Sequence, residues 1–353
     1  MSYGNPITFA RFRYMPGATP PPKAALALPG GLDARYAQLM AQVEAQLASA
    51  TKYSNGEVQR YTQHLLSAGG KRLRPLLTLL TAEFGDPTRP EIIDAAVAVE
   101  LTHLASLYHD DVMDSAPLRR GAPSAHTLWG NHAAILTGDL LFAKASSLTA
   151  GLGPQAVRIQ AEMFERLVLG QLHETLGPRT GENQVEFYLQ VLRDKTASLI
   201  ATAARYGAMF AQAPPNIVKA VAAYGELLGV AFQLADDVLD LTARPDASGK
   251  LPGTDLREAV LTMPVLLLRQ RVTEGTATEI ERSLLTALNG DLTDDATLAA
   301  VLAELQGTDV LAETQQLAAS YAAAAINELA RVPDGAAKQA LEALAQASVT
   351  REH

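Results

Sequence analysis

The chain has 353 residues, a formal net charge of −9 at pH 7 and no cysteine. The absence of cysteine excludes disulfides, thiolate zinc sites and cysteine nucleophiles, and the acidic balance excludes general nucleic-acid binding, which needs a basic surface. Alanine and leucine dominate and aromatic residues make up only 5%, so the composition predicts an almost wholly α-helical protein. We find no signal-peptide pattern and no uninterrupted apolar run of membrane-spanning length, which indicates a soluble, cytoplasmic protein without a transmembrane segment.

The predicted elements begin after an irregular arm at residues 1–30, which is rich in proline and glycine. From residue 31 to residue 353, helical patterns alternate with Gly, Pro and Asp punctuation, which predicts one helical domain. We expect helices near 32–50, 56–68, 75–84, 90–113, 131–150, 155–175, 183–210, 215–241 and 258–273, with several more in the C-terminal third. A long loop at 242–256 carries two prolines, two glycines and a lysine, and its length favours a functional role.

The segment SAGGKRLRP, between the second and third predicted helices, is basic. Its two glycines suit the left-handed end of one helix, and its proline suits the first turn of the next. Lys71, Arg72 and Arg74 are therefore expected at a helix N-terminus, where backbone N–H groups and the helix dipole favour an anion.

The stretch HDDVMD ends a long apolar helix with three carboxylates. Asp110 and Asp114 are four residues apart and share a helix face, where like charges cost roughly 0.2–0.5 kcal/mol. A single motif of this kind is more typical of a solvated acidic helix end than of a metal site. The stretch FQLADDVLD, however, repeats the spacing at Asp236 and Asp240, at the end of another apolar helix. Two copies favour a paired site.

Paired carboxylates without histidine partners suit Mg²⁺, which combines one or two carboxylates with waters and phosphate oxygens. The ligand should therefore carry phosphate. Arg119 and Arg120 follow the first acidic motif, where they could fork onto a second diphosphate, although an isolated arginine pair is typical of a solvated loop. Gln233 extends the second acidic face by one turn.

These motifs resemble, in order and spacing, those of the all-trans isoprenyl (polyprenyl) diphosphate synthases. The matching stretches are GGKRLRP, ELTHLASLYHDDVMDSAPLRRGAPS, GDLLFAKA, KTASLI, GVAFQLADDVLD and GKLPGTDLREAVLTMP, and the resemblance is close over about residues 55–265. It implies a bundle of long antiparallel helices around a central cavity, a homodimer, and condensation of isopentenyl diphosphate with an allylic diphosphate. The allylic diphosphate would ionise, the isopentenyl double bond would add to the cation, and loss of a proton would complete the step.

The resemblance also implies a role for each matching residue. Three Mg²⁺ ions, with substrate diphosphate bound, would be held by four carboxylates: Asp110, Asp114, Asp236 and Asp240. Isopentenyl diphosphate would be bound by Lys71, Arg74, His103 and Arg120. The allylic diphosphate or the ionised intermediate would be contacted by Arg119, Lys195, Thr196, Gln233 and Lys250. The residues central to catalysis would be Asp110, Asp114, Lys195 and Asp236.

One position departs from the family pattern. Where the family often has a second loop lysine, this chain has Val260, so Lys250 would carry that contact alone.

Product length is expected to depend on the helix that leads into the first acidic motif. In the family a bulky aromatic residue five positions before that motif stops the chain early, whereas this chain has Ala105, with Thr102 and Ala98 further down the helix. These small residues imply a medium-chain or long-chain product. Ala105 could instead be an ordinary core residue, and Tyr108 could narrow the mouth of the tunnel.

Three alternatives differ in what they require. A farnesyl or geranylgeranyl diphosphate synthase would share every motif and release a shorter product. A class I terpene cyclase would want Ser or Thr in place of Asp240 and Glu in place of Arg244. An inactive partner subunit of a heteromeric synthase would be expected to have lost one acidic motif, and both are intact.

Overall fold

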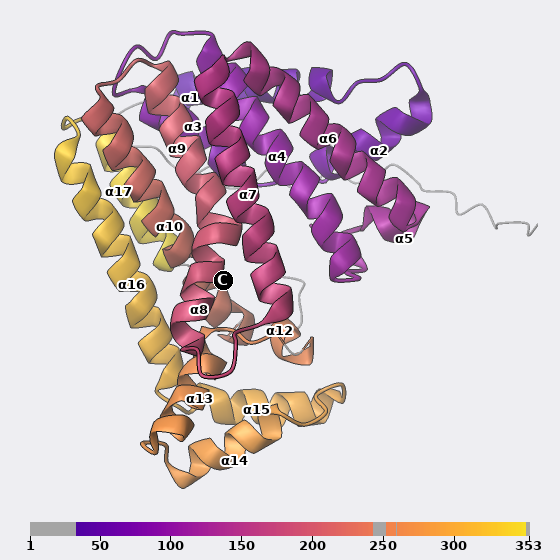
Figure 1. The fold of residues 1–353 in the computed structure, drawn as a ribbon, viewed down its shortest axis with the longest axis vertical. Helices are drawn as coiled ribbons and strands as arrows, with labels where there is room; N and C mark the ends of the chain where they lie inside the picture. Colours follow the sequence, from indigo (N-terminus) through magenta and orange to yellow (C-terminus); the bar gives the residue numbers. More distant parts are fainter. Residues whose placement is uncertain (1–32, 243–251, 259, 351–353) are drawn as a thin grey trace, which may run out of the picture.

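The structure, a computed structural model, describes residues 33–242, 252–258 and 260–350. Long helices make up almost all of it (Figure 1), so the predicted all-α fold is confirmed. The predicted arm at residues 1–30 and much of the predicted loop at 242–256 lie outside the described residues.

In chain order the elements are α1 (Asp33–Ala50), α2 (Gly56–Ser67), α3 (Leu73–Ala82), α4 (Glu91–Met113), β1 (Leu118–Arg119), β2 (Ala122–Pro123), α5 (Ala125–Trp129), α6 (Asn131–Gly151), α7 (Pro154–Leu176), α8 (Gln184–Leu192), the π-turn η2 (Arg193–Ala197), α9 (Ser198–Phe210), α10 (Pro215–Thr242), α12 (Thr254–Arg257), α13 (Met263–Glu274), α14 (Glu279–Leu288), α15 (Asp295–Gln306), α16 (Val310–Glu328), the 3-10 turn η3 (Leu329–Arg331) and α17 (Ala336–Val349).

Two hydrophobic cores follow each other along the long axis of the molecule. The upper core lies among α3, α4, α7, α9 and the first half of α10, and buries Leu80, Tyr206 and Tyr224. The lower core lies among the second half of α10 and α13–α16, and buries Leu234 and Leu268. Helix α10 therefore contributes to both cores, and its apolar side chains change partners half-way along its length.

A third cluster, the side core, packs α4 against α1, α2 and α6. Leu104 and Leu141 are fully buried there. In the upper core, by contrast, backbones approach closely: a Cβ atom on Gly207 of α9 would overlap the carbonyl oxygen of Thr78 on α3. Only glycine, which has no Cβ atom, allows α9 and α3 to approach this closely.

The structure differs from the prediction at three places. The helix predicted at 183–210 is interrupted by η2, and the helix predicted at 258–273 begins only at Met263, because Thr262 is extended and a proline follows in the first turn. Helix α12 falls inside the predicted loop.

A short hairpin, β1–β2, was also not predicted. Its two-residue turn has Arg120 at φ 56° and Gly121 at φ 77°, the left-handed pair typical of a type I′ hairpin turn. An Arg-Gly turn lacks the Asn-Gly signal that would have indicated it.

By length and composition, α10 is the one helix in the described part of the chain that could cross a membrane. Such a single helix is weak evidence, because the core helix of a soluble protein has the same properties. Here 56% of its most apolar window is buried inside the fold.

Candidate active site

The first acidic motif occupies the last turn of α4. Asp110 lies in the helix and Asp114 caps its C-terminal end, exposed to solvent. The pKa of the Asp110 carboxyl is raised to about 6, mainly by burial and also by the neighbouring Asp114, while Lys195 and Arg119 oppose the rise. Asp110 is therefore a carboxylate placed close to another carboxylate and to two cations from other elements.

The middle aspartate of this motif has a different environment. Asp111 is 0% exposed, and one of its oxygens accepts a hydrogen bond from Arg119 Nε at 2.6 Å. Burial raises the pKa of the Asp111 carboxyl, and Arg119 opposes that rise. Asp111 thus orients Arg119, the predicted ligand of the allylic diphosphate, and sequence reasoning did not assign it this role.

The second acidic motif lies near the end of α10, and its middle aspartate is again the buried, hydrogen-bonded one. Asp237 is buried and accepts hydrogen bonds from the Tyr188 hydroxyl at 2.9 Å and from the Met263 backbone N–H at 3.1 Å. Burial holds the pKa of the Asp237 carboxyl well above its ordinary value. This middle aspartate ties α10 to α8 and α13, and leaves Asp236 and Asp240 as the half-buried carboxylates of the motif.

The segment that follows α10 returns to the same motif. Asp240 accepts hydrogen bonds from Gly253 N–H at its carbonyl, 2.8 Å, and from Asp255 N–H at its carboxylate, 3.2 Å. Val260, which stands at the position of the second family lysine, donates its N–H to the Asp255 carbonyl at 2.8 Å. Lys250, the predicted loop ligand, lies outside the described residues.

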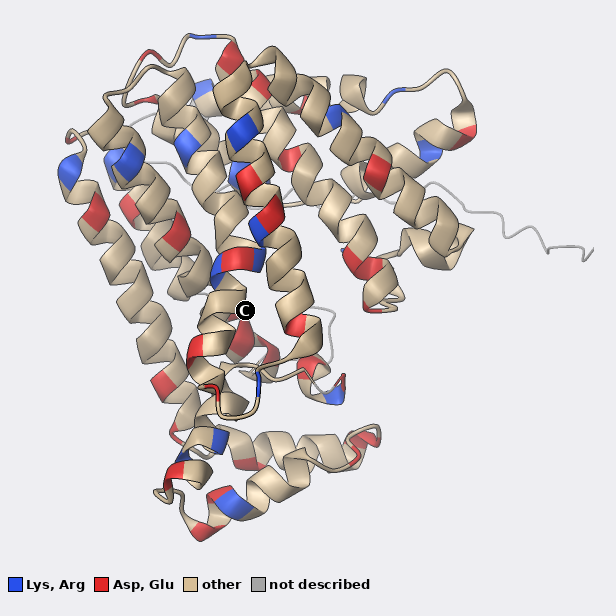
Figure 2. Ribbon diagram, viewed as in Figure 1, with Lys and Arg blue, Asp and Glu red and all other residues tan. Residues whose placement is uncertain are grey.

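The π-turn η2 connects the two motifs. Its Lys195 forms an ion pair with Glu174 at the lower end of α7 and lowers the pKa of Asp110. On its other side η2 packs against α10, because Ala197 lies directly over Gly229. Figure 2 shows acidic residues at the lower ends of both α4 and α10. Thr196 is half-buried in this turn, and Gln233 is half-buried on α10.

A basic cluster forms where the start of α3, the middle of α4 and the hairpin meet. Arg120 donates to the carbonyl oxygens of Leu65, at 3.2 Å, and Gly69. Its guanidinium lies against Gly70, where a Cβ atom would come within 2.8 Å of Arg120 Cζ. The predicted Gly-Gly turn is present, with Gly69 at φ 85° and Gly70 at φ 148°, and the missing side chain at Gly70 makes room for Arg120.

The electrostatics of this cluster indicate an anion site. The pKa of the Arg74 guanidinium is lowered to about 10, mainly by burial and also by the neighbouring Arg120, while Glu100 opposes the fall. Burial also holds the pKa of His103 well below its ordinary value, with added repulsion from Arg74 and Arg120. Within the described residues Arg74 Nε is buried without a hydrogen-bond partner. Such an orphan donor beside further cations suits an anionic ligand. Lys71 is exposed at the rim.

Arg72 lies at the N-terminus of α3, as predicted, but its side chain turns into the core. Its backbone is left-handed, at φ 49°, and its guanidinium pairs with Glu100 at 3.0 Å and with Glu44 at 2.5 Å. Glu100 is 2% exposed, and burial raises its pKa against the influence of Arg72, Arg74 and Arg120. One buried carboxylate therefore holds the basic segment to α4 and offsets part of its charge.

The residues expected to set product length are buried inside the bundle. Ala98, Thr102 and Ala105 are all 0% exposed. The Thr102 hydroxyl oxygen accepts a hydrogen bond from Gln160 Nε2 on α7 at 2.8 Å. The Ala105 carbonyl oxygen would lie 3.1 Å from a Cβ atom on Gly138 of α6. The row thus lies at the junction of α4 with α6 and α7, and the product length and the central cavity stay predictions.

Tyr108, considered as a residue that narrows the tunnel mouth, is turned elsewhere. It is 0% exposed, and its hydroxyl accepts a hydrogen bond from the Leu65 N–H at 3.2 Å on α2.

The carboxylates of the two acidic motifs fit Mg²⁺, the metal that the sequence predicts, because Mg²⁺ prefers oxygen ligands. Within the described residues, no three acidic or histidine side chains gather closely enough to hold an ion by themselves. Each motif instead offers two outer carboxylates, and Mg²⁺ characteristically completes its shell with waters and phosphate oxygens. Asp110, Asp114, Asp236 and Asp240 suit that arrangement.

Comparison with known proteins places this fold and site in one class. Residues 55–305 match the family model described as polyprenyl synthetase. The chain is 43% identical to nonaprenyl diphosphate synthase of Mycobacterium tuberculosis over 329 residues, covering 91% of this chain and 97% of that protein. It is 36% identical to heptaprenyl diphosphate synthase component 2 of Geobacillus stearothermophilus, covering 89% and 97% of the two chains.

A solved structure agrees with these relatives. Geranylgeranyl pyrophosphate synthase from Corynebacterium glutamicum, complexed with calcium and isoprenyl diphosphate, superposes with a TM-score of 0.82 at 40% identity, covering 92% of this chain and 98% of that one. The chain therefore belongs to the polyprenyl synthetase family. Within it, the protein is a polyprenyl diphosphate synthase, a prenyltransferase.

Proposed function

We propose that this enzyme condenses isopentenyl diphosphate with an allylic diphosphate, in a Mg²⁺-dependent reaction that ionises the allylic substrate, joins the two chains and eliminates a proton. The observation that supports this most directly is the division of labour in both acidic motifs. Asp111 and Asp237 are buried and hydrogen-bonded to neighbouring elements, whereas the first and last carboxylates of each motif are half-buried or exposed at the ends of α4 and α10.

The metal would be held by the outer carboxylates. Asp110, Asp114, Asp236 and Asp240 would bind three Mg²⁺ ions together with the substrate diphosphate. When bound, Mg²⁺ would neutralise charge that develops on the departing diphosphate. Lys195 would hold the same diphosphate from the π-turn. The remaining ligands of the allylic diphosphate would be Arg119, Thr196, Gln233 and Lys250.

Isopentenyl diphosphate would occupy the basic cluster. Arg74 and Arg120 would supply charged donors, Lys71 would close over the anion from the rim, and His103, kept neutral by its surroundings, would donate one hydrogen bond. Two diphosphates held at separate positions would place the isopentenyl double bond beside the allylic carbon and leave little rotational freedom to lose in the reaction.

The product would be a medium-chain or long-chain all-trans polyprenyl diphosphate. Small residues on α4 support this, as do the names of the nonaprenyl and heptaprenyl synthases among the relatives. A shorter, geranylgeranyl product is the alternative, because a structure with 40% identity carries that name. We further propose that residues 31–353 act as one cytoplasmic catalytic domain.

Diphosphate release by the purified chain tests this function. We expect release when isopentenyl and allylic diphosphates are supplied together with Mg²⁺, loss of release in excess EDTA, and recovery when Mg²⁺ is restored. A terpene cyclase would release diphosphate from the allylic substrate alone. Since one relative is named a component 2, the assay uses this chain without any partner. Inactivity of the folded chain alone would instead favour a heteromeric synthase.

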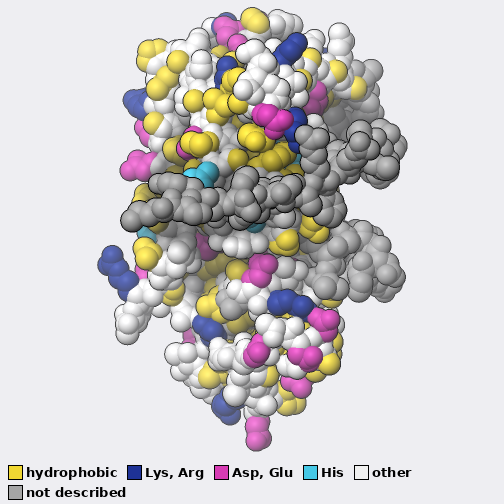
Figure 3. All heavy atoms as spheres, turned by 90° about the vertical axis from the view of Figure 1, so that its right-hand side faces the viewer, with side chains coloured by type: hydrophobic (Ala, Val, Ile, Leu, Met, Phe, Trp, Pro, Cys, Tyr) yellow, Lys and Arg dark blue, Asp and Glu magenta, His cyan; other side chains and the backbone are white. Residues whose placement is uncertain are grey.

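We propose a second copy of this chain as the partner. Helices α6 and α7 expose an apolar stripe that a soluble monomer would not be expected to leave in water: Ile135, Leu136, Val168, Leu169, Leu172 and Leu176. Figure 3 looks at the side of the molecule where α5 and α6 lie, and hydrophobic side chains gather there above and below the grey residues. An isologous pairing would bury the stripe of one copy against that of the other.

Charge placed on this stripe should separate the copies. We expect the Leu136→Glu/Leu172→Glu variant to elute and scatter light as a monomer at concentrations where the wild type is a dimer. The two side chains are 65% and 50% exposed, so the substitutions should leave the fold intact. Ile280→Glu is the matched control, because Ile280 is 68% exposed on α14, away from the stripe. A monomeric wild type, or a variant that stays dimeric, would exclude this interface.

A further inference from the structure

The π-turn η2 interrupts the regular α-helical hydrogen bonding between α8 and α9, and contacts with neighbouring helices stabilise it. Between α8 and α9 the backbone widens over Arg193–Ala197, and the N–H of Ser198 donates to the carbonyl of Arg193, five residues back. Single π-turns inside helices are rare and cluster at functional sites. This one carries Lys195 and Thr196, so whatever fixes the turn also fixes the direction of those two side chains.

Two glycines, Gly170 on α7 and Gly229 on α10, allow these helices to pack directly against the backbone of the turn. A Cβ atom on Gly170 of α7 would lie 2.5 Å from the backbone nitrogen of Lys195 and 2.9 Å from its Cα. A Cβ atom on Gly229 of α10 would lie 2.5 Å from the Cα of Ala197. The widened backbone therefore lies in direct contact with two neighbouring helices, and neither position has space for a methyl group.

An arginine on α7 adds polar restraint to the same turn. Arg166 Nε donates to Asp194 Oδ1 at 2.7 Å, and its Nη2 donates to the Arg193 carbonyl at 3.2 Å, the same oxygen that accepts the π hydrogen bond. Gln190 holds the other oxygen of Asp194 at 2.7 Å.

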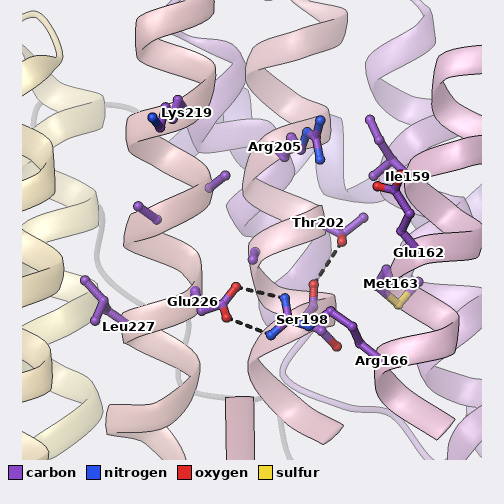
Figure 4. Close-up of a pocket in the computed structure, with 13 residues that line it drawn as sticks. Ile159, Glu162, Met163, Arg166, Ser198, Thr202, Arg205, Lys219, Glu226 and Leu227 are labelled. Atoms are coloured by element: carbon purple, nitrogen blue, oxygen red, sulfur yellow. Dashed lines mark hydrogen bonds and ion pairs between the residues drawn. The ribbon is translucent and has the colours of Figure 1, made fainter. Parts of the chain in front are cut away.

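The far side of the same guanidinium is fixed to α10. Arg166 donates to both carboxylate oxygens of Glu226, at 2.7 and 3.1 Å. Figure 4 shows Arg166 reaching from α7 to Glu226 beside Ser198. These residues line an open groove of about 540 Å³ between α7 and α10, floored by α9. Among the described residues, none of the predicted substrate ligands lines this groove, so we assign Arg166 no contact with the substrates.

We propose that Arg166, with Asp194 and Glu226, forms a positioning clamp that holds the π-turn in register and so aims Lys195 and Thr196 at the allylic diphosphate. The planar guanidinium satisfies four acceptor atoms, from three residues, in one fixed geometry, which a lysine ammonium does not reproduce. This inference rests on the proposed function, because it assigns the clamp a role in binding and ionising the allylic substrate.

The first test compares Arg166→Met with Arg158→Met. Arg158 lies on the same helix but is 68% exposed and only 3.8 Å from its partner Glu162, so it serves as the matched control. For Arg166→Met we expect kcat/KM for the allylic diphosphate to fall roughly tenfold to a hundredfold, since small misplacements cost that much. The KM for isopentenyl diphosphate should stay within about twofold of wild type, because its basic cluster does not include η2.

A second measurement does not depend on activity. Amide hydrogen exchange over residues 193–198 should accelerate at least about tenfold in Arg166→Met and stay unchanged in Arg158→Met. If the wild type proves inactive, the proposed function fails while this exchange comparison still decides whether the clamp holds the turn.

Gly170→Ala provides a test that keeps every charge. Its methyl group should push on Lys195 and produce the same two changes, whereas Gly151→Ala, where a Cβ atom meets nothing within 4 Å, should produce neither. This variant also decides the question if Arg166→Met fails to fold. The positioning role would be overturned if Gly170→Ala exchanged its turn amides at the wild-type rate. It would also be overturned if KM rose equally for the allylic and the isopentenyl diphosphate.

Discussion

Asp110→Asn and Asp236→Asn are each expected to lower kcat by about 10³-fold or more while the chain stays folded. Each substitution removes one carboxylate charge from the outer position of a motif, where the proposed metal ions neutralise the departing diphosphate, an effect worth several kcal/mol of barrier. Folding should persist, because a carboxylate beside other carboxylates contributes repulsion: Asp114 raises the pKa of Asp110.

The measurement is steady-state diphosphate release, with the melting temperature recorded alongside. Asp334→Asn is the matched control, since the Asp334 side chain is 95% exposed and its partner Lys338 is one helical turn away. The control should keep full activity. If either active-site variant retained activity within a few fold of wild type, both the metal assignment and the proposed mechanism would be wrong.

Ala105→Phe is expected to shorten the product by several isoprene units. If the growing chain passes along Ala105, Thr102 and Ala98, a phenyl ring at the first of these positions would block it one turn below the acidic motif. Chromatography of the products formed in excess isopentenyl diphosphate measures the effect. Ala105→Ser, which adds a single oxygen atom, is the control and should leave the product distribution unchanged.

Stability separates this expectation from its alternative. Ala105 is fully buried and belongs to the side core, where overpacking typically costs about 1–3 kcal/mol. If the position borders a tunnel, the ring has space and the melting temperature should change little. A strongly destabilised variant with unchanged product length would mean that Ala105 is an ordinary core residue.

The sequence predicted the long helices well because their signals are local. Apolar periodicity and punctuation gave the bounds of α1, α2, α4, α6, α7 and α10 to within two residues. The Gly-Gly turn before α3 was predicted for the same reason, since left-handed glycines are recognisable without knowledge of the fold.

Other features depend on contacts between distant segments and could not be predicted. The spacing of four residues singled out the outer aspartates of each acidic motif, but it gave no role to the middle one, and only the fold shows Asp111 turned to Arg119 and Asp237 turned to Tyr188. Arg72 resembled its basic neighbours until Glu100 proved to lie buried beside it.

The π-turn illustrates the same limit. Residues 193–197 have an ordinary helical composition, and the distortion coincides with close contacts from Gly170 and Gly229, which lie 23 residues before its first residue and 32 residues after its last. No periodicity argument within a short window can detect such a cause.

The passage of α10 through two cores has a further consequence, for cooperativity. Its residues up to Leu228 pack in the upper core and those from Val230 pack in the lower core, so the second acidic motif belongs to a different packing unit from the first. We expect the lower unit to open at a free energy below that of global unfolding, which would move Asp236 away from Asp110, because the helix end that carries Asp110 packs in the side core. A substrate that bridges the two motifs binds only while the lower unit is closed, so it opposes the opening by mass action. With substrate bound, the two packing units would unfold together, and α13–α15 would be protected from proteolysis.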